Sequence, residues 1–231
     1  MSHLILLNTI KAKSAVLTVG HGRGFLIESL GKRVVVTAAH CLPKFPPPRG
    51  ASYLHERTYG RLLGPLAGKR TVWAECLFAD PIADIAVLGS PNNLELSDEA
   101  DRYDALVDPL KPLRIAAAPE NGIAWLLSLK GDWFKCTVSY LKRIEGPLWV
   151  SPDQPIAGGM SGSPILSDDG KAIGVVCLGG NHDQYGYPNP RLVCDLPARF
   201  LRPRRIPIQL TAEEEARIAK SVVAATANRA H

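Results

Sequence analysis

The sequence is short of cysteine, of long apolar runs and of charge of one sign, and each shortage excludes a class of protein. Five cysteines, an odd number without C-x-x-C spacing, argue against a disulfide framework and a structural zinc site. No segment approaches the ~20 apolar residues of a membrane span. The net charge is only +5 and no long run of like charges occurs, which disfavours nucleic-acid binding. No metal, cofactor, nucleic-acid or membrane partner is therefore expected.

The first residues also lack the features of a leader. Met1–Asn8 contains a short apolar run without a basic segment before it, well below the roughly 7–15 residues of a signal-peptide core. A cytoplasmic protein is the simplest expectation, with its cysteines as buried thiols. The cysteines are Cys41, Cys76, Cys136, Cys177 and Cys194. A bridge between Cys177 and Cys194 stays open, and nothing indicates an oligomeric state.

The chain does contain enough apolar sequence for a large core. Apolar residues make up 46% of the 231 and charged residues 21%, as in globular proteins. Short strands punctuated by glycine predict a sandwich or barrel. In the first half we expect strands at 14–19, 24–28, 34–38, 71–79 and 85–88. In the second half we expect strands at 114–117, 123–129, 135–141, 148–150, 164–166, 173–178 and 191–196, with a hairpin at Gly131-Asp132.

Three other segments interrupt this pattern. The proline-rich stretch 43–70 reads as a long irregular insertion, which is either functional or a loop that merely covers the barrel. An amphipathic helix is expected at Ser97–Val107, within a linker over 91–112. In the tail 201–231, Thr211 and Glu214 form a capping box, which predicts a helix over about 212–227.

The candidate nucleophile lies in Gly158-Gly159-Met160-Ser161-Gly162-Ser163-Pro164. Glycines allow a tight turn with exposed N–H groups, because they carry no Cβ. Ser161 would occupy the tip of that turn. A serine hydroxyl needs a base to take its proton, and the base needs an orienting acid.

Two upstream segments supply these groups. The β-branched run beginning at Val34 ends at His40, and Asp84 stands at the start of an apolar strand. The order His40, Asp84, Ser161 is that of chymotrypsin-type enzymes rather than of subtilisins or α/β-hydrolases.

Three motifs together resemble the trypsin/chymotrypsin-like (PA clan) serine peptidase family. They are T-A-A-H-C at Thr37–Cys41, D-I-A-V-L at Asp84–Leu88 and G-x-S-G-x-P at Gly159–Pro164. The Asp84 segment is similar to the bacterial Htr/Deg protease domain. The resemblance covers about residues 14–200 and implies an all-β peptidase domain within 1–200. It would hold two six-stranded antiparallel β-barrels, about 13–90 and 113–200, with the active site between them.

The resemblance also implies roles for single residues. His40 would be the general base, Asp84 its orienting acid and Ser161 the nucleophile of a serine endopeptidase that forms an acyl-enzyme on a polypeptide substrate. The N–H groups of Gly159 and Ser161 would form the oxyanion hole. Asp80 precedes a proline and falls outside the motif, so Asp84 is preferred. The alternative is a catalytically silent module that keeps the fold to bind peptides.

Departures from trypsin refine these expectations. Met160 stands where an activating N-terminal ammonium would need an acid, so zymogen activation of that kind is not expected. Pro155 stands where cleavage after Lys or Arg requires an acid. The pocket walls would resemble the strand Cys177-Leu178-Gly179, whose backbone would pair with the substrate. Gly179 and Gly180 leave room for a side chain, so a small or medium apolar residue is expected on the acyl side. Arg191, at the pocket border, would instead favour an acidic residue, unless it is merely an exposed arginine.

Overall fold

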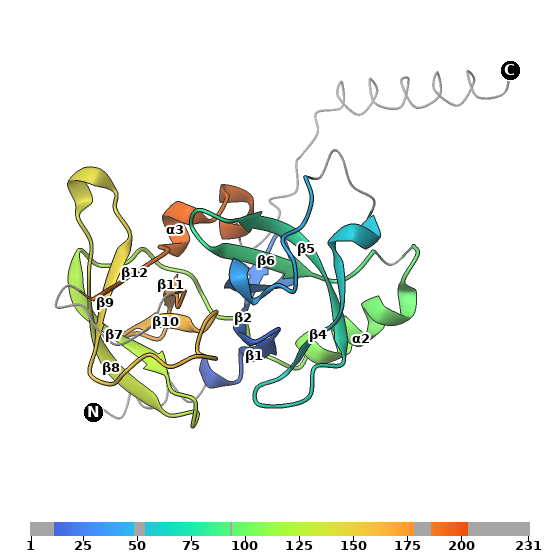
Figure 1. Ribbon diagram of the computed structural model, residues 1–231, viewed down its shortest axis with the longest axis horizontal. Helices are drawn as coiled ribbons and strands as arrows, with labels where there is room; N and C mark the ends of the chain where they lie inside the picture. The colour runs from blue at the N-terminus through green and yellow to red at the C-terminus, as the bar shows by residue number, and fades with distance from the viewer. Residues whose placement is uncertain (1–11, 49–53, 93, 178–185, 203–231) are drawn as a thin grey trace, which may run out of the picture.

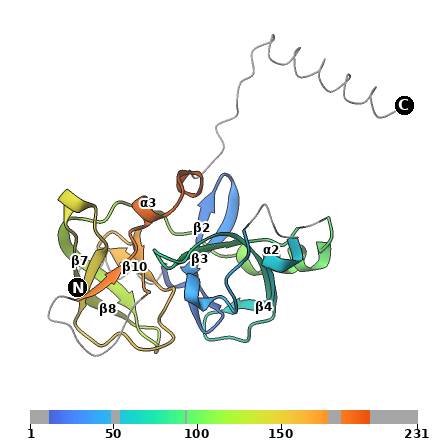
Figure 2. The same cartoon turned by 45° about the horizontal axis from the view of Figure 1, so that its top comes forward.

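The computed structural model describes residues 12–48, 54–92, 94–177 and 186–202. Within these ranges the chain forms two six-stranded antiparallel sheets, which lie side by side in Figures 1 and 2. The predicted all-β fold of two such units is confirmed. No helix in this part of the chain has the length and apolar character that crossing a bilayer requires.

The first sheet is a closed barrel in the order β1-β2-β3-β6-β5-β4. Its strands are β1 Val16–Val19, β2 Gly22–Ser29, β3 Lys32–Ala38, β4 Thr58–Pro65, β5 Val72–Asp80 and β6 Ile85–Gly89. The strand β3 lies between β2 and β6, with Val36 opposite Phe25 on one side and Val87 on the other. All three side chains are buried, so the β-branched run of the sequence forms the barrel core.

The second sheet has the order β11-β10-β7-β8-β9-β12 and forms a half-barrel. Its strands are β7 Asn121–Leu127, β8 Trp133–Ser139, β9 Leu148–Pro152, β10 Pro164–Ser167, β11 Ala172–Val175 and β12 Tyr187–Asn189. An isolated bridge between Gly174 and Arg191 joins its two edges. The expected second barrel is therefore open along most of that seam.

Among the described residues, the strands are accompanied by the helix α2 and by shorter helical segments. They are α2 Ser97–Val107, α3 Leu192–Asp195, η1 Ala39–Cys41, η3 Leu54–Arg57, η4 Lys142–Ile144 and η5 Ala198–Leu201. The helix α2 confirms the predicted bounds, and it lies at the outer edge of the barrel in Figure 1. It buries Ala100, Tyr103 and Val107, which recur on one helical face.

A short stretch after α2 is hydrogen bonded to both sheets. The Leu113 N–H donates to Leu26 O of β2 at 2.8 Å. The Ala172 N–H of β11 donates to Arg114 O at 2.8 Å, and Ala116 N–H donates back to Ala172 O at 3.0 Å. Residues 113–116 thus join the two lobes by their main chain, and the strand predicted at 114–117 exists only as isolated bridges.

Two sequence predictions were wrong. The supposed irregular insertion contains β4, whose pairing with β5 is interrupted by a bulge and whose Arg61 has φ +52°. The bulge breaks the alternation that reveals a strand. The strand predicted at 191–196 is the helical turn α3, because Leu192 and Leu196, four residues apart, are both buried. The helix predicted over 212–227 lies outside the described residues.

Candidate active site

His40 and Asp84 come together because their strands are paired. In the register of β3 and β6, Ala38 lies opposite Ile85, so the residues just beyond this pair meet at one end of the barrel. There the Nδ1 of His40 lies 2.6 Å from Oδ2 of Asp84, and the His40 main-chain N–H donates to Oδ1 at 2.9 Å. One carboxylate therefore holds both the ring and the backbone of the histidine.

This arrangement fixes which ring nitrogen faces outward. A carboxylate beside Nδ1 keeps the proton on that nitrogen and leaves Nε2 as the acceptor. The His40 side chain is 48% exposed, so the imidazole is not enclosed by the surrounding protein. Asp80, the other candidate acid, instead stabilises its own turn. Its Oδ1 accepts hydrogen bonds from the N–H groups of Ile82 and Ala83 at 2.8 and 3.1 Å.

Asp84 has an unusual main-chain conformation, with φ +53°. Aspartate tolerates this left-handed region better than most residues. Its carbonyl oxygen accepts the Ala39 N–H at 3.1 Å and lies 3.1 Å from the Cys177 thiol, which donates to it. The acid is thus fixed by contacts with η1 and with the segment that follows β11.

The loop that carries Ser161 is a tight turn with two left-handed glycines. Gly159 has φ +91° and Gly162 has φ +80°, which glycine adopts without steric cost. Met160 is buried, and its Sδ accepts the Ala157 N–H at 3.3 Å. Within the described residues, the N–H groups of Gly159 and Ser161 donate no hydrogen bond. The loop therefore offers two unpaired main-chain donors beside the serine.

Both lobes hold this loop in place. The Gly162 N–H donates to Val176 O at 2.6 Å, and the Val176 N–H donates to Ser163 O at 2.9 Å. From the other lobe, the Arg23 N–H donates to Ser161 O at 2.7 Å. These bonds place the Ser161 main chain between the two lobes.

Gly22 shows how close the serine lies to the histidine segment. A Cβ on Gly22 would stand 2.5 Å from Ser161 O and 2.7 Å from the Sγ of Cys41, the residue after His40. The structure thus brings the segments of all three predicted residues together. Among the described hydrogen bonds none joins Ser161 Oγ to His40 Nε2. This contact is often long in enzymes without substrate.

The thiols of Cys41 and Cys177 lie close to His40 and Asp84. Cys41 is buried, and burial raises its pKa to about 11. Burial, followed by the nearby Asp84 charge, also raises the pKa of Cys177. All five cysteines are free, so no Cys177–Cys194 bridge exists, and Cys194 is exposed rather than buried as expected.

Three of the residues predicted for the substrate pocket lie within the described part of the chain, namely Pro155, Cys177 and Arg191. Pro155 is exposed, and Leu178 and Gly179 lie outside the described residues. Cys177 directs its thiol to Asp84 O and its N–H to Asn189 Oδ1 at 2.7 Å.

Arg191 is buried, and its guanidinium contacts groups of the protein itself. It is 6% exposed, and its Nη2 donates to Glu145 O at 2.7 Å. Its guanidinium lies 4.2 Å from the centre of the Tyr140 ring. Both contacts hold this side chain within its own lobe.

Sequence reasoning missed Arg23, which lies between the strands expected at 14–19 and 24–28. The side chain is 6% exposed and donates from Nη1 to Leu127 O at 2.8 Å and from Nη2 to Ser128 O at 3.0 Å. Thr37, beside the histidine motif, donates from Oγ1 to Arg23 O at 2.6 Å. No local pattern reveals such contacts, because their partners lie about a hundred residues further along the chain.

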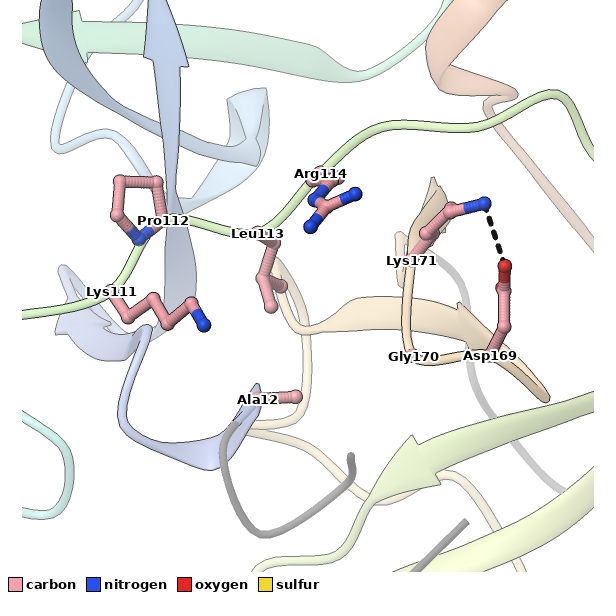
Figure 3. Close-up of a pocket in the computed structure, with 8 residues that line it drawn as sticks. All are labelled: Ala12, Lys111, Pro112, Leu113, Arg114, Asp169, Gly170 and Lys171. Carbon is pink, nitrogen blue, oxygen red and sulfur yellow. Dashed lines mark ion pairs between the residues drawn. The ribbon is translucent and has the colours of Figure 1, made fainter. Parts of the chain in front are cut away.

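A cavity elsewhere holds none of these residues. The close-up in Figure 3 shows Lys111, Arg114 and Lys171 around it, with Lys171 paired to Asp169 at 2.7 Å. In the part of the chain that the structure describes, no group of His, Cys, Asp and Glu side chains is arranged to hold a metal.

Comparisons with known proteins agree with this geometry. A family model described as "Trypsin-like peptidase domain" matches residues 22–175, more than half of the chain. No curated protein matches. The chain is similar to the solved Rv3671c protease in its inactive form, with TM-score 0.45, 18% identity and coverage of 74% of this chain and 80% of that one.

It is also similar to the serine endoprotease from Yersinia pestis, with TM-score 0.52 and 17% identity. That match covers 82% of this chain and 63% of the other, so this chain spans less than two thirds of that protein. At such identity the likeness concerns the fold. The family match rests on the sequence itself and includes both His40 and Ser161. The chain therefore belongs to the trypsin-like peptidase family.

Proposed function

We propose that the chain is a serine endopeptidase that uses Ser161, His40 and Asp84. Oγ of Ser161 attacks the peptide carbonyl while Nε2 of His40 takes the hydroxyl proton. The same nitrogen then protonates the leaving amine, and a water hydrolyses the acyl-enzyme. The observation that carries this proposal is the double contact of Asp84 with His40, at 2.6 Å to the ring and 2.9 Å to the main chain.

The unpaired N–H groups of Gly159 and Ser161 support the second half of the mechanism. They would donate to the oxygen that becomes negative in the tetrahedral intermediate. Each such donor contributes roughly 3–4 kcal/mol to transition-state stabilisation. The left-handed conformation of Gly159 explains why glycine is needed there.

We further propose that no new N-terminus has to be inserted beside the serine loop. The buried Met160 and its Sδ contact with Ala157 N–H occupy this part of the loop. A thioether forms no ion pair with an ammonium. We expect an N-terminal extension to leave activity unchanged, and activity that appears only after clipping would contradict the proposal.

Cleavage after a small or medium apolar residue remains part of the proposal. The position that would need an acid for Lys or Arg is Pro155, and Arg191 is tied to Glu145 and Tyr140. This removes the reason to expect an acidic preference. A peptide-library profile dominated by Lys, Arg, Asp or Glu would contradict this assignment.

A fluorophosphonate probe tests the central claim. We expect wild-type protein to be labelled on Ser161 and Ser161→Ala to stay unlabelled. Ser163→Ala is the matched control, because the Ser163 Oγ is buried without a hydrogen-bond partner. That variant should be labelled as fast as wild type. Assays with casein and with small esters, run side by side, then separate peptidase from esterase activity.

The alternative to a peptidase is a catalytically silent module that keeps the fold to bind peptides. If wild type stays unlabelled while folded, this alternative replaces the peptidase. Labelling that disappears in His40→Ala as well as in Ser161→Ala excludes it, because both groups are then required.

A further inference from the structure

We infer that Arg23 is a positioning residue for the Ser161 loop, holding it from two sides through its main chain and its guanidinium. The inference rests on the proposed peptidase function, because it concerns the donors beside Ser161. Arg23 belongs to β2 of the barrel, whereas the groups that it binds belong to the other lobe. It is therefore a link between the lobe that carries His40 and the lobe that carries Ser161.

The main chain of Arg23 holds one side of the loop. Its N–H donates to Ser161 O at 2.7 Å, and its own carbonyl oxygen accepts the Thr37 hydroxyl at 2.6 Å. The same carbonyl packs so closely on Gly162 that a Cβ there would overlap with it. The position of Ser161 is thus tied to β2 and β3, and through Thr37 to the segment that leads to His40.

The guanidinium holds a second element. Nη1 and Nη2 donate to the carbonyl oxygens of Leu127 and Ser128, at 2.8 and 3.0 Å. The side chain is buried, and no carboxylate among the described residues forms an ion pair with it. Burial lowers its pKa accordingly. Burying a cation among neutral oxygens costs folding free energy unless its N–H groups form good hydrogen bonds. The planar guanidinium of arginine can donate to two adjacent carbonyl oxygens at once.

Those two carbonyls begin the turn between β7 and β8, and this turn reaches the predicted oxyanion hole. The turn closes through Ser128 N–H to Asp132 O at 2.8 Å. Its next residue, Leu129, places Cδ2 3.4 Å from where a Cβ of Gly159 would be. Arg23 therefore contacts Ser161 directly and supports Gly159 through Leu129. One residue thus links the Ser161 main chain to the turn that packs beside Gly159.

The test compares variants of Arg23 with matched variants of Arg33. Arg33 is a suitable control because its Nη1 also donates to main-chain oxygens, those of Val107 and Leu110, at 2.6 and 2.8 Å. These lie at the end of α2 and not at the serine loop. The readouts are the rate constant of fluorophosphonate labelling, kcat and KM for a small ester, and the melting temperature.

We expect Arg23→Lys and Arg23→Ala to lower kcat and the labelling rate about tenfold to hundredfold, with KM little changed. Removing one oxyanion donor lowers kcat by ~10²–10³. Here the main-chain bond to Ser161 remains, and the Gly159 donor is displaced through Leu129 rather than removed. Arg33→Ala should lower the melting temperature but keep the wild-type labelling rate. Guanidinium chloride at millimolar, non-denaturing concentration should partly restore Arg23→Ala, because the free cation can occupy the same place.

If Arg23→Ala fails to fold, Arg23→Lys and Leu129→Ala carry the test, since Leu129 is 52% exposed and its truncation leaves the core intact. A labelling rate equal to wild type in these two variants overturns the inference. A loss matched by Arg33→Ala overturns it too, because the effect is then one of stability. If folded wild type reacts with neither probe nor ester, the proposed function itself is wrong.

Discussion

The carboxylate of Asp84 accepts hydrogen bonds from both the ring and the main chain of His40, at 2.6 and 2.9 Å. Two contacts from one group fix the rotation of the imidazole as well as its tautomer. Asp84 is itself held by its carbonyl oxygen, which accepts from Ala39 N–H and from the Cys177 thiol. The orientation of the proposed base is thus set before any substrate binds.

Asp84→Asn tests this arrangement. Asparagine also tolerates the left-handed conformation, so we expect the fold to persist. Its amide would favour the wrong tautomer of His40, and kcat for a small ester should fall on the order of 10⁴. Asp80→Asn is the control, because the Asp80 carboxylate accepts hydrogen bonds from the main chain of its own loop and not from His40. Equal losses in the two variants would contradict the assignment of Asp84.

Two glycines of the serine loop should respond differently to alanine. Gly162 has φ +80°, and a Cβ there would overlap with Arg23 O, so Gly162→Ala should destabilise the protein by about 3 kcal/mol or more. A Cβ on Gly158 meets nothing within 4 Å. Gly158→Ala should therefore stay within about 1 kcal/mol of wild type. Urea unfolding measures the stability of both variants. A similar loss of stability in the two would contradict the prediction, because the loop would then have relaxed around the new Cβ of Gly162→Ala.

Thiol reactivity should separate Cys194 from the others. It is the exposed cysteine, whereas Cys41, Cys76, Cys136 and Cys177 are buried. We expect iodoacetamide to modify one site per native chain, and all five after denaturation. Mass spectrometry locates the site, and Cys194→Ser should abolish native labelling. Fast native modification of Cys41 would show that the site opens readily.

Stability should fall in alkaline solution. Burial raises the pKa of Cys41 and Cys76 to about 11 and that of Cys136 to about 12. Above pH ~9 the unfolded chain loses these protons while the native chain keeps them, so the free energy of unfolding decreases with pH. Each thiol contributes at most about 1.4 kcal/mol per pH unit in this range. Urea unfolding measures the slope, which Cys76→Ala should reduce.

The sequence alone predicted those features that depend on short segments of the chain. The helix Ser97–Val107 is visible in its spacing, and His40 and Asp84 each adjoin a strongly apolar strand. Their pairing follows from the register of two neighbouring strands. The glycines around Ser161 predicted a tight turn, and Gly159 and Gly162 adopt the left-handed conformation that such a turn uses. The roles of Gly159 and Ser161 came from the family resemblance and remain predictions.

Other features depend on contacts that no short segment reveals. The bulge in β4 interrupts its alternation, and Arg191 is buried against Tyr140 and Glu145 O, contacts that its own segment does not reveal. Arg23 looks like a turn residue between two glycines until its carbonyl partners, more than a hundred residues away, are placed beside it. Long-range hydrogen bonds of this kind need the tertiary structure.

The segment 113–116 determines how the two lobes unfold. Leu113 is bonded to β2, while Arg114 and Ala116 are bonded to β11. Neither lobe can melt without removing main-chain partners from the other. We therefore expect calorimetry to record one endotherm for both lobes. His40 and the serine loop would then separate in the same cooperative transition.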